Sequence, residues 1–284
     1  MQTVVITGAS SGIGRAAARH LAAKGWRVFA GVRKSADADA LEGDHENIVP
    51  LILDVADDES LNAAVATVDQ ALGGAKLAGL VNNAGIAQMG PLVLQPLDEI
   101  EAHFKVNVFG AIACTQAFAS LLGMERERTG APGRIINITS VGGRIASPFL
   151  GAYTATKHAL ESVTDTLRRE LVIYGIDSIA IGPGAVKTPI WDKAEEKNED
   201  TPYANSEWAD AIDRFSQTLL QGGRDGLSAE HIASVIETAL SDPSPKARYA
   251  PVPNKLTNFT IPTRLPKRWL DGIFASRFGM KKPA

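Results

Sequence analysis

The stretch "TVVITGASSGIG", residues 3–14, combines an apolar strand, a glycine-rich turn and the start of a helix. The valines and isoleucine at its beginning are typical of a strand, and the alanine-rich residues 13–24 predict a helix. Gly8, Gly12 and Gly14 allow the backbone to turn tightly and approach a pyrophosphate, whose charge is stabilised at a helix N-terminus. Glycines alone are weak evidence, but strand, glycines and helix stand here in the required order. The stretch therefore predicts dinucleotide binding.

The pattern of this first stretch continues along the chain, with short runs rich in valine and isoleucine separated by helical segments. The predicted strands are residues 3–7, 27–32, 48–55, 77–83, 134–139 and 178–182. The predicted helices are residues 13–24, 61–72, 96–122 and 152–174. Nearly continuous apolar strands are typical of a parallel sheet covered on both faces. We therefore predict a doubly wound, Rossmann-type α/β fold, with one domain over residues 1–250 and an extension over 251–284.

Residues 187–226 interrupt this alternation. They contain the charged run "DKAEEKNED" followed by "SEWADAIDRFSQTLL". In the second run, Trp208, Ile212, Phe215 and Leu219 fall on one face of a helix. We predict that this segment is a substrate lid.

The tail from Lys246 onward is basic, with nine lysines and arginines against one acidic residue. In its sequence "PKRWLDGIFASRFG", the apolar residues Leu270, Ile273, Phe274 and Phe278 are predicted to share one helical face. Such a stripe is compatible with contact to a membrane surface, or with packing against the domain or a sister subunit. Packing is the commoner arrangement, and we favour it.

Composition excludes several classes of protein. A net charge of -3 over 284 residues argues against nucleic-acid binding, which requires many basic side chains. The single cysteine, Cys114, cannot form an intrachain disulfide and is expected in the core. A strand begins almost at Met1, and no apolar run reaches the roughly 18 residues of a membrane span, so we expect a cytoplasmic protein. The five histidines lack metal-ligand spacing, and no metal is expected.

A tyrosine and a lysine stand four positions apart in "GAYTATKHAL", residues 151–160. Residues with this spacing are neighbours on a helix, so the ammonium of Lys157 can lie beside the phenol of Tyr153. At about 4 Å and an effective dielectric of 20, such a charge is worth on the order of 4 kcal/mol, partly offset by desolvation. We therefore predict that the pKa of Tyr153 is lowered by roughly two units, into a range useful for acid–base catalysis.

Further motifs give the chain a family resemblance. "NNAG" stands at residues 82–85, Asn107 in "KVNVFG", Ser140 in "NITS", "YTATK" at 153–157 and "PGAVKTP" at 183–189. With the glycine-rich turn, these motifs resemble the short-chain dehydrogenase/reductase family, and they occur in the family's order. Each motif alone is weak evidence, but together they are highly specific.

The resemblance implies a catalytic tetrad of Asn107, Ser140, Tyr153 and Lys157. In this tetrad Tyr153 is the general acid or base, Ser140 holds the substrate oxygen, and Asn107 tethers a water that supplies protons to Lys157. The residues expected to bind the cofactor are Gly8, Ser10, Ser11, Gly12, Ile13, Gly14, Arg33, Asp54, Val55, Asn82, Ala84, Gly85, Tyr153, Lys157, Pro183, Gly184, Val186 and Thr188. The alternatives left open are that Asn107 only bends a helix, and that Ser140 and Asp54 only cap local structure.

The end of the second strand predicts which cofactor is preferred. An acid here would bind the ribose 2′-hydroxyl of NAD(H), but this chain has Arg33 and Lys34, with no acid before Asp37. The guanidinium of Arg33 suits the 2′-phosphate of NADP(H), so we predict that NADP(H) is preferred over NAD(H). Arg33 is the only basic signal, because Ser11 occupies the family's other basic position, and a solvent-facing Arg33 remains the alternative.

The resulting functional prediction is an NADP(H)-dependent oxidoreductase that interconverts a small-molecule alcohol and ketone. The expected walls of the substrate site are bulky and apolar: Val141, Phe149, Ile190, Trp191, Trp208 and Phe215. One alternative, an epimerase or dehydratase, is disfavoured by the G-x-x-x-G-x-G spacing of the turn. Another, a non-enzymatic NADP sensor, is disfavoured by the retained Tyr-Lys pair. Relatives pair the helices at 96–122 and 152–174 with symmetry mates, so we expect a homodimer or homotetramer, with Cys114, Phe118 and Leu167 at apolar positions there.

Overall fold

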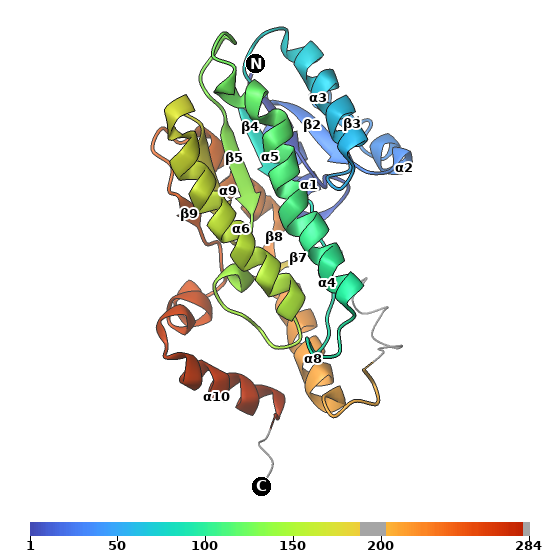
Figure 1. Cartoon of the computed structure of the whole chain (residues 1–284), viewed down its shortest axis with the longest axis vertical. Helices are drawn as coiled ribbons and strands as arrows, with labels where there is room; N and C mark the ends of the chain where they lie inside the picture. The colour runs from blue at the N-terminus through green and yellow to red at the C-terminus, as the bar shows by residue number, and fades with distance from the viewer. Residues whose placement is uncertain (188–202, 281–284) are drawn as a thin grey trace.

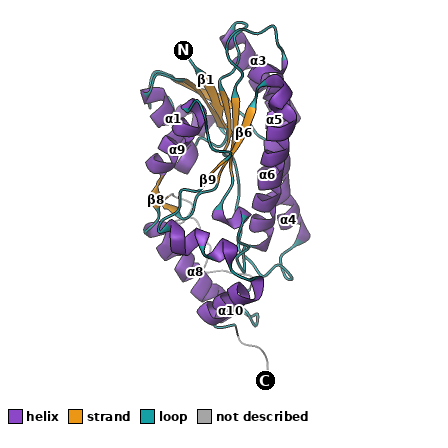
Figure 2. Ribbon diagram, turned by 90° about the vertical axis from the view of Figure 1, so that its left-hand side faces the viewer, coloured by secondary structure: helices purple, strands orange, loops and turns teal. Residues whose placement is uncertain are grey.

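The computed structural model describes residues 1–187 and 203–280, and it contains a seven-stranded sheet between two layers of helices (Figures 1 and 2). The strands of this sheet are β1 (Thr3–Ile6), β2 (Arg27–Val32), β3 (Ile48–Ile52), β4 (Gly79–Asn82), β5 (Arg134–Ile138), β6 (Asp177–Ile181) and β9 (Arg248–Tyr249). Around it lie α1 (Gly12–Ala23), α2 (Ser35–Asp39), α3 (Asp58–Leu72), α4 (Leu97–Phe104), α5 (Ala111–Ala119), α6 (Gly151–Glu170) and α9 (Ala229–Ser241).

The strand order is β3-β2-β1-β4-β5-β6-β9, and every neighbouring pair is parallel. The chain moves outward from β1 to β3 and then returns to place β4 on the other side of β1, which creates a switch point between β1 and β4. This arrangement confirms the predicted doubly wound, Rossmann-type fold and all six predicted strands. The seventh strand, β9, was not predicted, because two residues are too short to show a pattern.

Apolar packing covers both faces of the sheet. On one face, α1 and α9 pack against the strands through Leu21, Ile232 and Ile236, all fully buried. On the other face, α3 and α5 contribute Val68 and Phe118, also fully buried. Figure 2 shows α1 and α9 on one side of the sheet and α3, α5 and α6 on the other. The two layers fix the carboxyl ends of the strands, where the glycine-rich turn and the tetrad lie.

A continuous helical stretch, Leu97–Met124, joins α4 and α5 through the π-helical segment η1 (Lys105–Gly110) and ends in η2 (Ser120–Met124). By length and composition it is the one described helix apolar enough to cross a membrane, but 56% of its most apolar window is buried inside the protein. Cys114 lies in that buried part, where burial raises the pKa of its thiol to about 12. The expectation that Cys114 and Phe118 face a partner subunit is wrong, because both are fully buried in the core.

Two segments of the last third of the chain build the opposite end of the molecule, whereas α9 and β9 belong to the sheet and its helical layers. A two-stranded parallel sheet, β7 (Val186–Lys187) and β8 (Leu227–Ser228), brackets α8 (Ala209–Arg224). After β9 come η5 (Leu256–Thr260), η6 (Pro262–Arg264) and α10 (Lys267–Phe278), and Figure 1 shows α10 beside α8 at the end farthest from the N-terminus.

The apolar stripe predicted for α10 divides between two faces. Phe278 is 3% exposed and packs with Phe274 against Phe215 of α8, as expected of a helix that packs on its own domain. Ile273, which was predicted on the same face, is instead 51% exposed, and so is Trp269 at 68%. The stripe is therefore two patches, because Trp269 and Ile273 are one turn apart on the side away from Phe274 and Phe278.

Candidate active site

The glycine-rich turn lies at the switch point between β1 and β4. Gly8 and Gly12 have positive φ angles of 66° and 55°, which side chains rarely adopt. A Cβ at Gly8 would lie 2.8 Å from the Cα of Ala84, and one at Gly14 would overlap the carbonyl oxygen of Gly8. The helix after the turn has Ser11 at its N-cap without a side-chain capping hydrogen bond. The first turn of α1 thus offers backbone N–H groups to an anion, as dinucleotide binding requires.

Thr7 and Asn83 connect this turn to the end of β4. The backbone N–H groups of Asn83 and Ala84 each donate to Thr7 Oγ1, at 3.0 Å. Asn83 Nδ2 donates back to the carbonyl oxygens of Thr7 at 2.9 Å and Gly8 at 3.0 Å. Neither Thr7 nor Asn83 was among the predicted site residues, although both lie inside the motifs that indicated the site. They hold the turn that was predicted to hold the cofactor.

Ser140 and Tyr153 meet at the end of β5. Ser140 begins the short helix η3 (Val141–Gly143), and its Oγ accepts a hydrogen bond from Gly142 N at 3.0 Å. The same hydroxyl lies near Tyr153, which the first turn of α6 presents, and it acts to lower the pKa of the phenol. Ser140 thus caps η3, as the alternative interpretation stated, but it also lies beside Tyr153.

Lys157 lies one turn further along α6. Its Nζ is 5.7 Å from the centroid of the Tyr153 ring and donates to the carbonyl oxygen of Ile138 at 2.8 Å. The Lys157 residue is 5% exposed. The four-residue spacing therefore brings tyrosine and lysine to one face of α6, as predicted.

Asn107 completes the tetrad from the π-helical segment η1. Its Oδ1 accepts from Ile86 N at 2.8 Å, and its Nδ2 donates to Ile86 O at 2.9 Å and to Thr156 Oγ1 at 3.0 Å. A Cβ at Gly85 would lie 3.2 Å from Asn107 Oδ1 and 3.7 Å from Lys157 Nζ. Asn107 and Lys157 thus meet beside Gly85. Ser140 and Tyr153 meet beside Gly142, where a Cβ would lie 3.3 Å from Ser140 Oγ and 3.6 Å from the ring of Tyr153.

The electrostatics of the tetrad differ from the prediction. Burial raises the pKa of Tyr153 above its usual value, although the Ser140 hydroxyl opposes this shift. Burial also lowers the pKa of Lys157 to about 8. The predicted lowering of the Tyr153 pKa is therefore wrong in direction, because the loss of hydration of a phenolate at this depth exceeds the attraction to a lysine whose charge is itself destabilised.

Glu161 lies one further turn along the same face of α6 and is 6% exposed. It accepts from Thr139 Oγ1 at 2.6 Å, and it pairs with Arg248 of β9 at 2.9 Å and with Arg144 at 3.1 Å. Arg248 Nη2 also reaches the carbonyl oxygen of Ser140 at 3.5 Å. This network joins α6, β5 and β9 directly behind the tetrad. Sequence analysis missed it, although Glu161 continues the four-residue spacing of Tyr153 and Lys157.

Other predicted cofactor residues lie along the same edge of the sheet. Arg33 is exposed after β2, and Lys34 is the N-cap of α2. Asp54 follows β3, where its Oδ1 accepts from Ala56 N at 3.0 Å, the capping role of the alternative interpretation. Val55 is 6% exposed and packs against the position of Gly110 in the long helix.

The carboxyl ends of β1, β4 and β5 border the site, which we call the crevice. The side chain of Asn82 points into the core rather than toward this crevice. Its Nδ2 donates to Asn137 Oδ1 at 2.8 Å and to Thr115 Oγ1 at 3.2 Å, beneath the end of β4. The backbone of the following residues, Ala84 and Gly85, lies at the crevice instead. Asn82, the first residue of the "NNAG" motif, therefore supports the site from beneath the end of β4.

The segment after β6 borders the crevice on its other side. The carbonyl oxygen of Pro183 accepts from Val141 N at 2.9 Å, and Gly184 N donates to Pro251 O at 3.0 Å. Val186 is 6% exposed in β7. Thr188 lies outside the described residues. Ser10, Ser11 and Ile13, in the glycine-rich turn, are exposed or half-buried.

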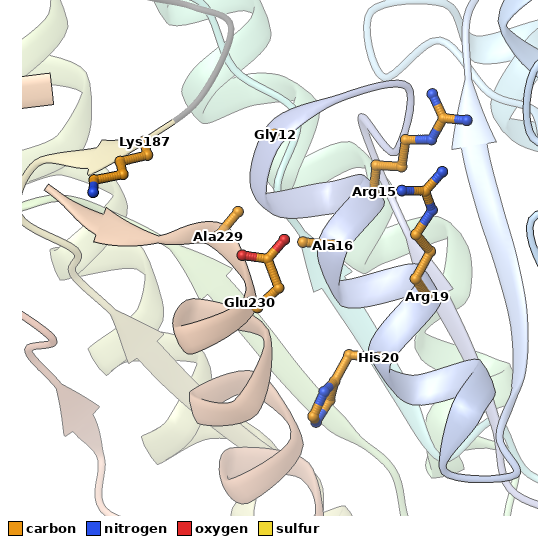
Figure 3. A pocket seen from close by; sticks show the side chains of 8 residues that line it. All are labelled: Gly12, Arg15, Ala16, Arg19, His20, Lys187, Ala229 and Glu230. Carbon is orange, nitrogen blue, oxygen red and sulfur yellow. The ribbon is translucent and has the colours of Figure 1, made fainter. Parts of the chain in front are cut away.

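A cavity of about 430 Å³ lies on the outer side of α1, between α1 and α9 (Figure 3). Of the predicted cofactor residues only Gly12 lines it, and no tetrad residue does. Two of its cations, Arg15 and Arg19, are paired with Asp44 at 2.9 and 2.7 Å. These two guanidinium groups, first that of Arg19, hold the pKa of Asp44 far below its usual range. In Figure 3 the side chains of both arginines point away from Lys187.

Aromatic rings form the end of the crevice toward α8. Phe149 packs edge-on against Phe215 at 5.7 Å, and Phe215 packs edge-on against Phe278 of α10 at 5.2 Å. Phe149 has a positive φ of 61°, a strained conformation for an aromatic residue. Phe149 and Phe215, two of the predicted walls, are buried in one apolar cluster, and Trp208 packs against it. Val141 is half-buried at the start of η3, whereas Ile190 and Trp191 lie outside the described residues.

The crevice fits a nicotinamide dinucleotide on two observations. The positive φ angles and missing Cβ atoms at the turn leave room for a pyrophosphate beside the start of α1. The absence of a Cβ at Gly85 keeps open the spot between Asn107 and Lys157. Within the described ranges, no group of three or more histidine, cysteine or acidic side chains is arranged to hold a metal ion.

Comparisons with known proteins agree with this geometry. The profile of the family described as short chain dehydrogenase matches residues 2–199. The chain is 38% identical over 275 residues to NADPH-dependent 3-dehydrocapnine reductase of Ornithobacterium rhinotracheale, with 96% of each chain covered. A short-chain dehydrogenase from Streptomyces avermitilis has a similar structure, with a TM-score of 0.77 at 26% identity over 99% of this chain and 98% of that one. A short chain dehydrogenase/reductase from Burkholderia phymatum in complex with NAD gives 0.76 at 26% identity, over 96% and 95% of the two chains.

Proposed function

The chain belongs to the short-chain dehydrogenase/reductase family and is an NAD(P)-dependent oxidoreductase that acts on carbonyl and alcohol groups, and we propose that it reduces a bulky, apolar ketone with NADPH. The observation that carries this proposal is the placement of Asn107 and Lys157 beside Gly85 and of Ser140 and Tyr153 beside Gly142, with Tyr153 and Lys157 on one face of α6. An epimerase or dehydratase is not favoured, because the relative with 96% coverage is named a reductase.

The bound nicotinamide supplies or accepts the hydride, and the protein supplies the proton and the fixed geometry. The glycine-rich turn and the first turn of α1 would hold the pyrophosphate, as Gly8 and Gly12 allow the required backbone approach. Lys157 and the spot beside Gly85 would hold the nicotinamide ribose. Thr7 and Asn83 keep this cradle in place through the four hydrogen bonds that join β1 to β4.

Tyr153 acts as the proton donor to the ketone oxygen. Because burial raises its pKa, the phenol stays protonated at neutral pH, which is the state that reduction needs. The Ser140 hydroxyl, already fixed by Gly142 N, orients the phenol and can hydrogen-bond the oxygen on which charge develops. Lys157, with its pKa near 8, is partly able to release a proton at neutral pH and so can restore the one that Tyr153 gives up.

The preference for NADPH is supported by Arg33. This guanidinium is exposed at the end of β2, and among the described residues it has no ion-pair partner that would compete with a phosphate. The relative from Ornithobacterium rhinotracheale is named NADPH-dependent, whereas the structure from Burkholderia phymatum is a complex with NAD. Arg33 is therefore the residue on which the proposed preference depends.

The proposed substrate is bulky and apolar because the predicted walls of its site belong to an apolar cluster with α8 and α10. Phe149, Phe215 and Trp208 offer π surface and apolar area but few hydrogen-bond partners. The helix α8, with Phe215 on its inner face, lies in the segment proposed as a substrate lid. The relative named for a 3-dehydro compound supports reduction, rather than oxidation, as the direction.

We also propose a cytoplasmic homodimer or homotetramer. Phe109 is 60% exposed in the middle of the long helix and would be covered by a partner subunit. Light scattering at micromolar concentration checks this assignment, and a monomer would contradict it.

A single experiment tests the proposed reaction. The purified protein is incubated with NADPH and a panel of ketones that range from acetone to long-chain and polycyclic ketones, and absorbance of the reduced cofactor is followed. We expect consumption of NADPH with the larger ketones and an alcohol product in equal amount. Nucleotide sugars are run in parallel, and their epimerisation without net NADPH consumption would contradict the proposal.

A further inference from the structure

The C-terminal extension exposes apolar side chains that nothing in the described chain covers. Leu256 and Ile261 are 64% and 45% exposed, and Trp269 and Ile273 of α10 are 68% and 51% exposed. Leu256 lies in η5, Ile261 lies between η5 and η6, and Trp269 and Ile273 lie in α10. We call these four residues the outer patch. Large apolar side chains exposed at four positions of one short extension indicate a contact with another surface.

The outer patch is distinct from the contact that holds α10 on the domain. Phe274 and Phe278 of α10 pack with Phe215 of α8, with ring centroids of Phe278 and Phe215 5.2 Å apart. Trp269 and Ile273 are four residues apart and lie on the other side of the helix. One side of α10 is therefore used by the fold, and the other side carries apolar residues that the fold does not use.

Exposed basic side chains alternate with the residues of the outer patch along the chain. Lys255, Arg264, Lys267 and Arg268 are exposed. The one acid of the tail, Asp271, is 3.6 Å from Arg268, whose side chain is still 95% exposed. With nine lysines and arginines against one acid from residue 246 onward, the extension has an excess of positive charge in a chain with a net charge of -3.

We propose that the outer patch docks on the surface of an anionic lipid bilayer. Tryptophan, isoleucine and leucine fit the boundary between headgroups and acyl chains, where the tryptophan ring is favoured. The neighbouring lysines and arginines extend to anionic headgroups, and each contributes attraction that salt screens.

A second copy of the chain is the less favourable occupant. A symmetric dimer brings the same surface of both copies together. Lys255, Arg264, Lys267 and Arg268 of one copy would then meet the same cations of the other, with Asp271 as the one acid of the tail to pair with them. An anionic bilayer has the opposite charge and the apolar interior that the outer patch needs. The proposal does not rest on the proposed reaction, since it concerns a surface away from the tetrad.

Co-sedimentation with vesicles tests the proposal on the full chain without substrate. Wild-type protein is mixed with vesicles of phosphatidylcholine alone and of phosphatidylcholine with about 30% phosphatidylserine, at low and high salt. We expect at least ten-fold stronger binding to the anionic vesicles, weakening as salt rises. Equal binding to both vesicles, or binding to neither, would overturn the proposal.

Two variants separate the apolar and charged contributions. Trp269→Glu/Ile273→Glu removes apolar side chains, and Lys267→Gln/Arg268→Gln removes charges from exposed positions and so leaves the fold intact. We expect each to weaken binding to anionic vesicles at least ten-fold, with unchanged circular dichroism and melting temperature. A charge variant that binds as wild type does would overturn the proposal even if the apolar variant misfolds.

The matched control is Val172→Glu/Ile173→Glu. These two residues are 68% and 67% exposed in η4 (Leu171–Tyr174), which follows α6 at its far end. We expect this variant to bind anionic vesicles as wild type does. An equal loss in the control would show that vesicle binding does not depend on the outer patch, and it would contradict the proposal. Sedimentation velocity completes the test, because dissociation of an oligomer by Trp269→Glu/Ile273→Glu would identify the patch as an interface between copies and contradict docking on lipid.

Discussion

The crevice at the ends of β1, β4 and β5 and the aromatic cluster between α8 and α10 are held together in different ways. In the crevice, directional hydrogen bonds fix each functional group, such as those of Asn107 to Ile86 and of Lys157 to Ile138. In the cluster, Phe215 meets Phe149 and Phe278 through ring contacts. Hydrogen bonds lose their value with small displacements, whereas apolar packing tolerates exchange of similar volumes. The groups of the crevice are therefore rigidly placed, whereas the cluster, which we propose as part of the substrate site, tolerates exchange of its side chains.

Removal of the proposed proton donor has the largest expected effect and tests the crevice alone. Tyr153→Phe keeps the ring and removes the hydroxyl, and general acid catalysis is worth roughly 10² to 10⁴ in rate. We expect kcat to fall about 10³-fold with every ketone, while NADPH affinity measured by fluorescence stays within a few-fold. A variant that keeps turnover within a few-fold of wild type would remove Tyr153 from the mechanism.

Glu161→Gln tests whether the network behind the tetrad positions it. The amide cannot balance Arg248 and Arg144, so we expect the backbone at Ser140 to shift. The expected result is a kcat reduced about 30-fold with NADPH affinity retained, and a lower melting temperature. Glu170→Gln, at the exposed end of α6, is the control and should behave as wild type. Loss of stability with kcat unchanged would restrict Glu161 to a structural role.

Arg33→Ala tests the proposed preference for NADPH at the cofactor end of the crevice. A charge-assisted hydrogen bond to a phosphate is worth about 1.5 to 3 kcal/mol, and 1.4 kcal/mol corresponds to a factor of ten. We expect wild type to prefer NADPH in kcat/KM, and the preference to shrink at least ten-fold in the variant. Lys34→Ala is the neighbouring comparison, with a smaller expected change. A wild type that prefers NADH would refute the assignment.

The pH dependence of reduction has the smallest expected effect near neutrality. Lys157, with a pKa of about 8, carries its proton below that pH and loses it above. Because the charged form supplies the proton, kcat/KM should be constant below pH 7, halved near pH 8 and lower beyond. Lys157→Arg stays protonated throughout, so any activity it retains should show no fall near pH 8. An unchanged profile in that variant would place the titrating group elsewhere.

Sequence analysis succeeded where local order determines structure. The glycine-rich turn, the strands and the four-residue spacing of Tyr153 and Lys157 are all local patterns, and the fold brings them together as predicted. Interactions between distant segments were missed: Glu161 and Arg248 are 87 residues apart, and the two-residue strand β9 has no pattern of its own. The direction of the Tyr153 pKa was wrong because spacing shows a neighbouring charge but not the depth of burial.

The proposed separation of chemistry in the crevice from substrate choice in the aromatic cluster has one most direct test. This test compares kcat/KM for a small and a bulky ketone, with NADPH, in three proteins. Wild type should prefer the bulky ketone. Tyr153→Phe should lose activity on both ketones by the same large factor, because the proton donor serves every carbonyl. Phe215→Leu, which keeps an apolar side chain in the cluster, should lose about ten-fold on the bulky ketone and little on the small one. Equal losses on both ketones in Phe215→Leu, or a loss in Tyr153→Phe that depends on ketone size, would contradict the separation of chemistry from substrate choice.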